Sequence, residues 1–130
     1  MRGICGGKKM GRHVLSAVLV MAALAAAPLP VQARDLLFWN MTEHEMVGVY
    51  LAAPGSNAWG PNLALSDTID YTAQGDERIR MPGVVPGTYD AKLVDTTGQT
   101  CIVPNVVVKG TGKVALGIEE SQLTHCTSHP

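Results

Sequence analysis

From residue 34 onward the chain is a series of short runs rich in β-branched and aromatic residues, separated by Gly, Pro, Asn and Asp. No window there places apolar residues at helical spacing over three turns, whereas several runs alternate polar and apolar side chains. This pattern is typical of an antiparallel sandwich or barrel. We therefore expect an all-β fold: a single small antiparallel β-sandwich, immunoglobulin-like or related, with six to seven strands. The expected strands are 35–40, 46–53, 77–81, 88–95, 101–109 and 113–118, with 68–73 as an optional seventh.

Side-chain alternation within these runs predicts which residues face the core. In the second run, Val47, Val49 and Leu51 are expected to share one face, and in the third run both arginines are expected to face solvent. The turn after the fourth run ends in Gly98, which supplies the positive φ that a tight hairpin needs. Pro104 lies in the next run, so that strand is expected to tolerate it only at an edge or a bulge.

The first 33 residues have the three parts of a secretory signal peptide. Four cations stand in the first twelve residues, and an apolar run follows from Val14 to Leu29. The segment ends in Val31-Gln32-Ala33, so we expect cleavage between Ala33 and Arg34, with a cut after Ala27 as the alternative. An uncleaved anchor is the other interpretation, but the apolar run is shorter than the roughly 20 residues that a membrane span needs.

The chain is accordingly divided into a signal peptide at 1–33, a β-sandwich domain at 34–118 and a polar C-terminal tail at 119–130. The expected location is the periplasm or the cell exterior, with no membrane span after cleavage. Without its leader the chain has 6 cations and 11 acids, a formal charge of −5. This balance argues against a nucleic-acid-binding protein, which would carry a basic stripe.

Cleavage would leave two of the three cysteines, Cys101 and Cys126, because Cys5 lies in the leader. An even count in an oxidising compartment first indicates a disulfide. Closing a loop of this length would stabilise the fold by roughly 3–4 kcal/mol. A pair of free thiols is the alternative.

The connection between the second and third runs, PGSNAWGPNLALS at 54–66, is the most distinctive segment of the chain. Most strand connections are shorter, and long ones are often functional. One interpretation makes Trp59, together with Gly60 and Asn62, a binding platform for a sugar or an apolar side chain, since Trp offers a large, rigid face. The other folds Trp59 back as a plug at the end of the sandwich, with Leu63 and Leu65 packed beneath it.

The stretch 38–65 combines an Asn-x-Thr strand end, an apolar strand with Tyr near its end, a Pro-Gly turn and a Trp-Gly-x-Asn-Leu loop, and Gly75, Tyr89-Asp90 and Gly98 follow. This pattern resembles a family of small secreted bacterial β-sandwich proteins of uncharacterised function, over roughly 40–101. One departure is Gly87, where such proteins often carry a cysteine, so the disulfide here is expected to link other elements. The resemblance implies a fold and a compartment, and no activity. More loosely, Val85-Pro-Gly-Thr-Tyr89 resembles a strand start of secreted immunoglobulin-like and carboxypeptidase-regulatory-like modules.

Two sets of side chains could hold a metal. Imidazole, thiolate and thioether groups suit copper, and their spacing here matches no closed zinc motif. The other interpretation is a charged hairpin turn and a frayed tail. The copper set is Met41, His44, Met46, His125, Cys126 and His129, and it needs Cys126 unpaired. A calcium interpretation of Asp67, Asp70, Asp76 and Glu77 lacks the regular spacing of a calcium loop.

The sequence does not favour catalysis. None of the serines after the leader (Ser56, Ser66, Ser121 and Ser128) lies in a nucleophile-elbow sequence, and the expected strands present no inward-pointing pair of acids for acid–base chemistry. We expect a monomeric, non-enzymatic binding or accessory module without a cofactor, which uses the 54–66 loop to contact an unknown protein or glycan in the cell envelope. The alternative is a periplasmic copper-binding or carrier protein.

Overall fold

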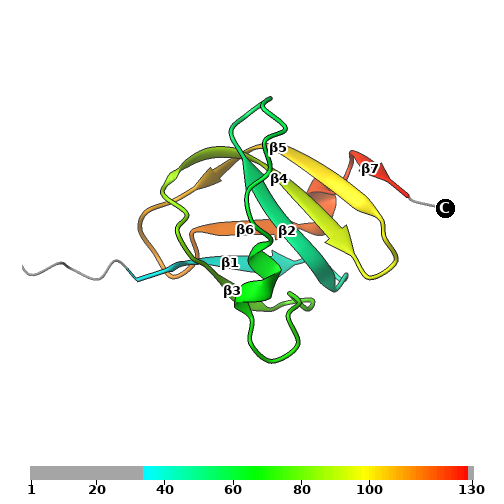
Figure 1. The fold of residues 1–130 in the computed structure, drawn as a ribbon, viewed down its shortest axis with the longest axis horizontal. Coiled ribbons are helices and arrows are strands. Elements are labelled where there is room, and N and C mark those ends of the chain that lie inside the picture. Colours follow the sequence, from blue (N-terminus) through cyan, green and yellow to red (C-terminus); the bar gives the residue numbers. More distant parts are fainter. Residues whose placement is uncertain (1–33, 129–130) are drawn as a thin grey trace, which may run out of the picture. The chain divides into compact units, whose positions relative to one another are not determined.

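The structure, a computed structural model, describes residues 34–128, which build two β-sheets (Figure 1). The signal peptide expected at 1–33 and His129 lie outside the described residues. Two short 3-10 turns interrupt the strands, η1 at Leu63–Ser66 and η2 at Glu120–Gln122. Over the described range, no helix is long and apolar enough to cross a membrane.

The two sheets form a small β-sandwich, as the sequence predicts. The first sheet has the order β3-β1-β6, with β1 at Leu36–Met41, β3 at Arg78–Met81 and β6 at Leu116–Glu119. The second sheet has the order β2-β4-β5-β7, with β2 at Met46–Ala52, β4 at Gly87–Asp95, β5 at Thr100–Val108 and β7 at Cys126–Thr127. Neighbouring strands are antiparallel except β1 and β6, which run parallel. That pair differs from the purely antiparallel expectation. Strands β2 to β5 lie between β1 and β6 in the sequence, and a parallel pairing requires such a long connection.

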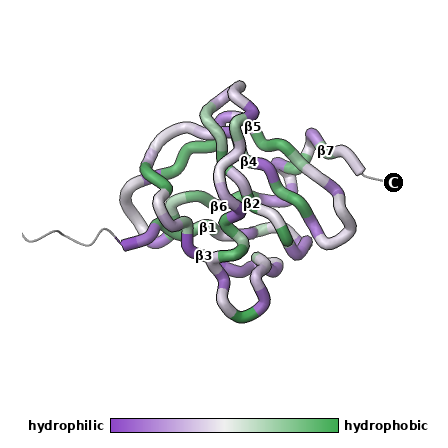
Figure 2. The backbone as a smooth tube through the Cα atoms, viewed as in Figure 1, coloured by the Kyte–Doolittle hydropathy of each residue, from purple (hydrophilic) through white to green (hydrophobic). Residues whose placement is uncertain are grey.

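The core consists of side chains from the inner faces of both sheets. Phe38 of β1, Met81 of β3, Leu93 of β4 and Ile118 of β6 are almost completely buried, whereas the arginines of β3 are exposed as predicted. Figure 2 shows most strongly hydrophobic residues on the strands and many hydrophilic ones in the connections. Alternation with a period of two therefore fixes which side of each strand faces the core.

The predicted inward face of β2 is wrong at its first residue, Val47. Val49 and Leu51 are buried, but Val47 is 38% exposed. The pairing of β2 with β4 shifts between Met46 and Gly48, so Val47 is the extra residue of a β-bulge. Met46 occupies the buried position instead and is 2% exposed.

The C-terminal segment is built into the sandwich rather than loosely held. The optional strand at 68–73 does not form, and only its last residue, Ala73, bridges to Met46. The seventh strand is β7, which pairs with β5 through Cys101 and Cys126, and these two cysteines form the expected disulfide. Leu123 packs against the core. The domain therefore extends past the predicted boundary at 118.

The two irregular positions expected around β5 are confirmed. Gly98 has φ 85° in the hairpin between β4 and β5. Pro104 lies in a bulge, because Tyr89 and Ala91 of β4 pair with Val106 and Val103 and leave two residues of β5 opposite one. The bulge bends β5 beside the start of the 54–66 loop.

Candidate functional site

The 54–66 loop lies along the free edge of β2, the outermost strand of its sheet. The backbone N–H of Gly60 donates to the carbonyl of Leu51 (2.9 Å). The Asn62 side chain takes the next positions along this edge: Oδ1 accepts from the N–H of Val49 (3.0 Å), and Nδ2 donates to the carbonyl of Val47 (2.9 Å). The loop thus pairs with backbone groups that an exposed strand edge would leave open.

Gly60 and Asn62 therefore hold the loop in place. A Cβ atom at Gly60 would lie 3.3 Å from the carbonyl oxygen of Leu51, so glycine permits the close approach. Asn62 Oδ1 also accepts from the N–H of Ala64 (3.0 Å) and caps η1. The structure therefore gives both residues a role in fixing the backbone that carries Trp59.

Asp90 of β4 anchors the start of the same loop. Its carboxylate accepts from the N–H of Gly55 (2.8 Å) and from the N–H of Asn105 in the β5 bulge (3.0 Å). These two hydrogen bonds, the Gly55 bond first, lower the pKa of Asp90 below its usual value. One carboxylate therefore joins the loop to the bulge, and both are fixed at the same end of the sandwich.

Trp59 lies beside the outward face of the four-stranded sheet. Tyr50 of β2 and Lys92 of β4 are cross-strand partners, and they point outward because their neighbours Leu51 and Leu93 are buried. The Lys92 ammonium lies 4.9 Å from the centre of the Trp59 ring and 4.6 Å from that of the Tyr50 ring. This geometry does not fit a plug at the end of the core.

Two aromatic rings and one ammonium thus form a mixed platform on the surface. We call Tyr50, Trp59 and Lys92 the outer aromatic site. Each cation–π contact at an exposed position is worth about 0.5–1 kcal/mol. Leu63, from the same loop, is buried in the core, while Leu65 is 58% exposed. Only one of the two leucines therefore packs beneath the loop. Tyr50, Trp59 and Lys92 themselves are half-buried.

The Asn-x-Thr strand end has a structural role. The side chain of Asn40 is completely buried, and its Nδ2 donates to the carbonyls of His44 (2.7 Å), Ala73 (2.9 Å) and Gln74 (3.0 Å). Its Oδ1 accepts from the hydroxyl (2.7 Å) and the N–H (3.1 Å) of Thr42. This network fixes the turn between β1 and β2, and hence the position of His44.

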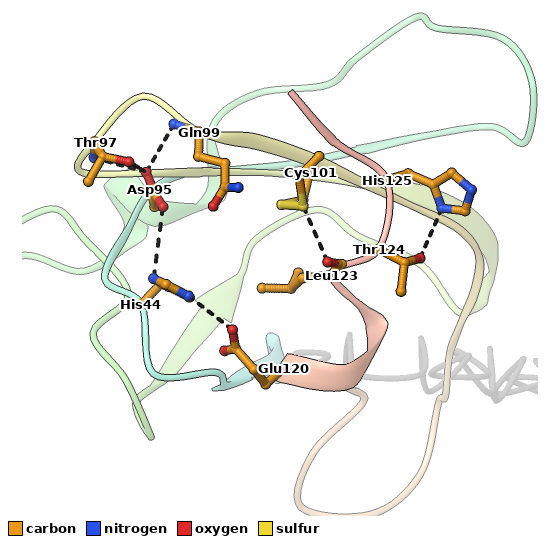
Figure 3. Close-up of a disulfide and its surroundings, with 10 residues drawn as sticks. His44, Asp95, Thr97, Gln99, Cys101, Glu120, Leu123, Thr124 and His125 are labelled. Atoms are coloured by element: carbon orange, nitrogen blue, oxygen red, sulfur yellow. Dashed lines mark hydrogen bonds and ion pairs between the residues drawn. A yellow bond between two sulfur atoms is a disulfide. The ribbon is translucent and has the colours of Figure 1, made fainter. Parts of the chain in front are cut away.

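His44 connects three segments near the disulfide (Figure 3). Its Nε2 lies 3.0 Å from Oε1 of Glu120 in η2, and its Nδ1 lies 3.9 Å from Oδ2 of Asp95 at the end of β4. Asp95 Oδ1 also accepts from Thr97 Oγ1 (2.6 Å) and from the N–H of Gln99 (3.0 Å). Burial raises the pKa of Asp95, but the hydrogen bonds from Thr97 and Gln99 and the charge of His44 outweigh burial, so the net pKa is lowered.

The structure does not bring the copper set together. Cys126 is in the disulfide, and Met46 is buried in the core. His44 and His125 lie on opposite sides of the disulfide in Figure 3 and have different partners, with His125 Nδ1 3.1 Å from the hydroxyl of Thr124. Met41, on β1, packs over Gly117 of β6. Within residues 34–128, no three His, Cys, Asp or Glu side chains form a group that could hold a metal.

The acids of the calcium interpretation make hydrogen bonds in or beside their own loops. Asp67 accepts from the N–H of Asp70 (3.2 Å), and Glu77 accepts from the N–H of Gln74 (2.7 Å). Asp76 accepts from Nε1 of Trp39 (2.9 Å). These contacts give the carboxylates a local structural role.

Sequence reasoning identified Trp59 but missed Tyr50 and Lys92. Their outward direction follows from strand alternation, which is readable in the sequence. Their proximity follows from the register of β2 against β4, which the bulge at Val47 shifts by one residue. The contact with Trp59 depends in addition on the loop that runs back along β2.

Comparison with known proteins identifies no relative of this chain. No known protein family, no curated protein and no solved structure matches this chain.

Proposed function

We propose that this chain is an exported, non-enzymatic binding or accessory module, which contacts a protein or glycan of the cell envelope through Trp59. The observation that carries the proposal is the outer aromatic site: the Trp59 ring lies beside Lys92 on the outward face of a sheet, outside the core. Large aromatic side chains at a surface are typical contact residues, since they bury much area at little entropy cost.

The anchoring of the loop supports the same proposal. Gly60, Asn62 and Asp90 hold the loop through backbone groups on both sides of Trp59. A contact residue on a fixed backbone loses little conformational freedom on binding, which favours affinity. The Lys92 ammonium between the rings adds a donor for a carbonyl, hydroxyl or carboxylate of the partner.

Export is supported by the composition of the leader and by the disulfide between Cys101 and Cys126. Disulfides persist in the periplasm and outside the cell and are rare in the cytosol of mesophiles. The proposed location is therefore periplasmic or extracellular.

The test replaces Trp59 by Ala and measures retention on two purified envelope materials, insoluble peptidoglycan and immobilised detergent-solubilised envelope proteins. Leu65→Ala, in the same loop and exposed, is the matched control. We expect Trp59→Ala to lower retention at least tenfold, with a melting temperature within a few degrees of the wild type. The Trp59 ring lies outside the core, and its contact with Lys92 is worth about 0.5–1 kcal/mol.

Three results would contradict the proposal. The first is equal retention of Trp59→Ala and the wild type. The second is a large fall in the melting temperature of Trp59→Ala, which would indicate a core role. The third is a wild-type protein that neither material retains.

A further inference from the structure

A second surface feature lies on the other sheet. A groove of about 1190 Å³ runs between the outward side of β1 and the loops at one end of the sandwich, and its volume exceeds the roughly 300–1,000 Å³ of most ligand clefts. Its lining is mainly apolar. The apolar part comprises Leu37, Trp39, Val84, Val85, Pro86 and Val114.

Positive charge gathers at this groove in an otherwise acidic chain. Its lining includes three of the six cations after residue 33, namely Arg34, Arg78 and Lys113. Of the 11 acids, only Asp35 lines the groove. Among the basic residues within 34–128, only His44 lies within 4.0 Å of a carboxylate oxygen. The three cations are therefore available to an external anion.

Arg78 is held in a position that suits a carboxylate. Its guanidinium stacks on the Trp39 ring, 4.0 Å from the ring centre, and the Trp39 ring is itself fixed by its hydrogen bond to Asp76 (2.9 Å). Stacking uses the face of a guanidinium and leaves its N–H edge free, and that edge matches the two oxygens of a carboxylate.

We propose that this groove binds a free fatty acid of the length of laurate or longer. The carboxylate lies at Arg78, with Arg34 and Lys113 at the rim, and the acyl chain lies on Leu37, Val84 and Val114. An acyl chain needs no hydrogen bonds, whereas a peptide bound in extended form seeks a strand edge. The floor here includes β1, the central strand of its sheet, which has no free edge. This site is on the opposite sheet from the outer aromatic site, so the two proposals are independent.

The chain offers its own reporter for the test, since Trp39 and Trp59 are its only tryptophans. The test uses the full protein purified from the cell that exports it. In this protein, Trp59→Phe leaves Trp39 as the sole source of tryptophan emission. The variant is titrated with laurate below its micellar concentration, and calorimetry gives the affinity independently of emission. Octanoate and dodecyltrimethylammonium serve as short-chain and cationic probes.

We expect a saturable change with laurate. Octanoate should bind at least tenfold more weakly, since each buried methylene strengthens binding up to roughly fourfold, and the cationic probe should bind at least tenfold more weakly than laurate. Arg78→Gln should weaken laurate binding at least tenfold, as expected for a charged hydrogen bond. Lys113→Gln, at the rim, should weaken it up to about fivefold, as expected for an exposed charge pair. Lys92→Gln, on the other sheet, should leave the affinity unchanged.

The proposal is overturned if laurate gives no saturable response, if the cationic probe binds as tightly, or if Lys92→Gln weakens binding as much as Arg78→Gln. It is also overturned if the emission changes only with anionic phospholipid vesicles, which would indicate a membrane surface. Lys113→Gln, in an exposed loop, keeps the test valid should Arg78→Gln fail to fold.

Discussion

The backbone N–H of Gly60 donates a hydrogen bond of 2.9 Å to the carbonyl of Leu51, and this contact lays the 54–66 loop against the edge of β2. Asn62 continues the pairing at Val49 and Val47. Trp59 immediately precedes Gly60, so its ring is held where the edge of the sheet meets the outward face. Anchoring and contact therefore reside in different residues of one loop, and substitutions can separate them.

Asn62→Ala should lower the free energy of unfolding by about 2 kcal/mol, because three backbone groups lose their partner and each net hydrogen bond is worth about 0.5–1.5 kcal/mol. Asn62→Asp should lose about half of this, since a carboxylate still accepts from Val49 and Ala64 but cannot donate to Val47. Urea unfolding measures both. Ser56→Ala, in the same loop, is the control, and an Asn62→Ala variant as stable as this control would contradict the anchoring role.

Asn40→Ala should destabilise the fold by about 3 kcal/mol, because a buried network loses its central amide and unpaired buried groups cost about 1–3 kcal/mol each. Asn40→Asp, although isosteric, should be no better, since its carboxylate would face the carbonyls of His44, Ala73 and Gln74. Thermal melting of the two variants checks this. Recovery of wild-type stability by Asn40→Asp would show that Nδ2 donation is unimportant.

Removal of the disulfide should cost about 3.5 kcal/mol, the loop-closure value for the sequence separation of 25 between Cys101 and Cys126. For a domain of this size, that corresponds to a fall of roughly 15 °C in melting temperature. The double variant Cys101→Ala/Cys126→Ala and the reduced wild type should melt together, and reductant should not affect the double variant. A wild type that melts at the same temperature with and without reductant would contradict the bridge.

Acid should destabilise the protein partly through Asp95. The pKa of Asp95 is lowered from its usual 3.8 in the folded state, so the folded chain binds fewer protons than the unfolded chain at low pH. The resulting stability is present above the unfolded pKa and is lost as pH falls through the folded pKa.

Urea midpoints between pH 6 and pH 3 should therefore fall less steeply for Asp95→Asn than for the wild type. Thr97→Val, which removes the hydroxyl that donates to Asp95, should show a smaller change in the same direction. Some slope should remain in Asp95→Asn, because hydrogen bonds also lower the pKa values of Asp70 and Asp90. An unchanged slope in Asp95→Asn would exclude the role of this carboxylate.

The sequence was sufficient for the fold class because one face of most strands is buried. In β3 the alternation alone places Ile79 and Met81 in the core. The alternation predicts the wrong face for Val47, because a bulge inserts one residue there. The carbonyl of Val47 also accepts a hydrogen bond from Asn62, which lies in the following loop. A local pattern contains no information about such a partner.

The candidate site was predictable only in part for the same reason. Trp59 stands out in its loop, but its neighbours Tyr50 and Lys92 are brought to it by strand register and by the path of the loop. The polar composition of 119–130 suggested a loose tail, whereas one apolar side chain, Leu123, and the disulfide at Cys126 tie this segment to the core. Two specific contacts thus decide whether this segment joins the fold, and its average composition does not.

Intact mass and metal content, measured on the protein purified from its exported location without reductant, decide whether the chain is an exported and disulfide-closed module. We predict a mass equal to residues 34–130 less two hydrogens, with no bound metal. Retention of residues 1–33 would rule out cleavage after Ala33, and two free thiols with stoichiometric copper would rule out the disulfide-closed module. The second result would make the His, Met and Cys set the functional site.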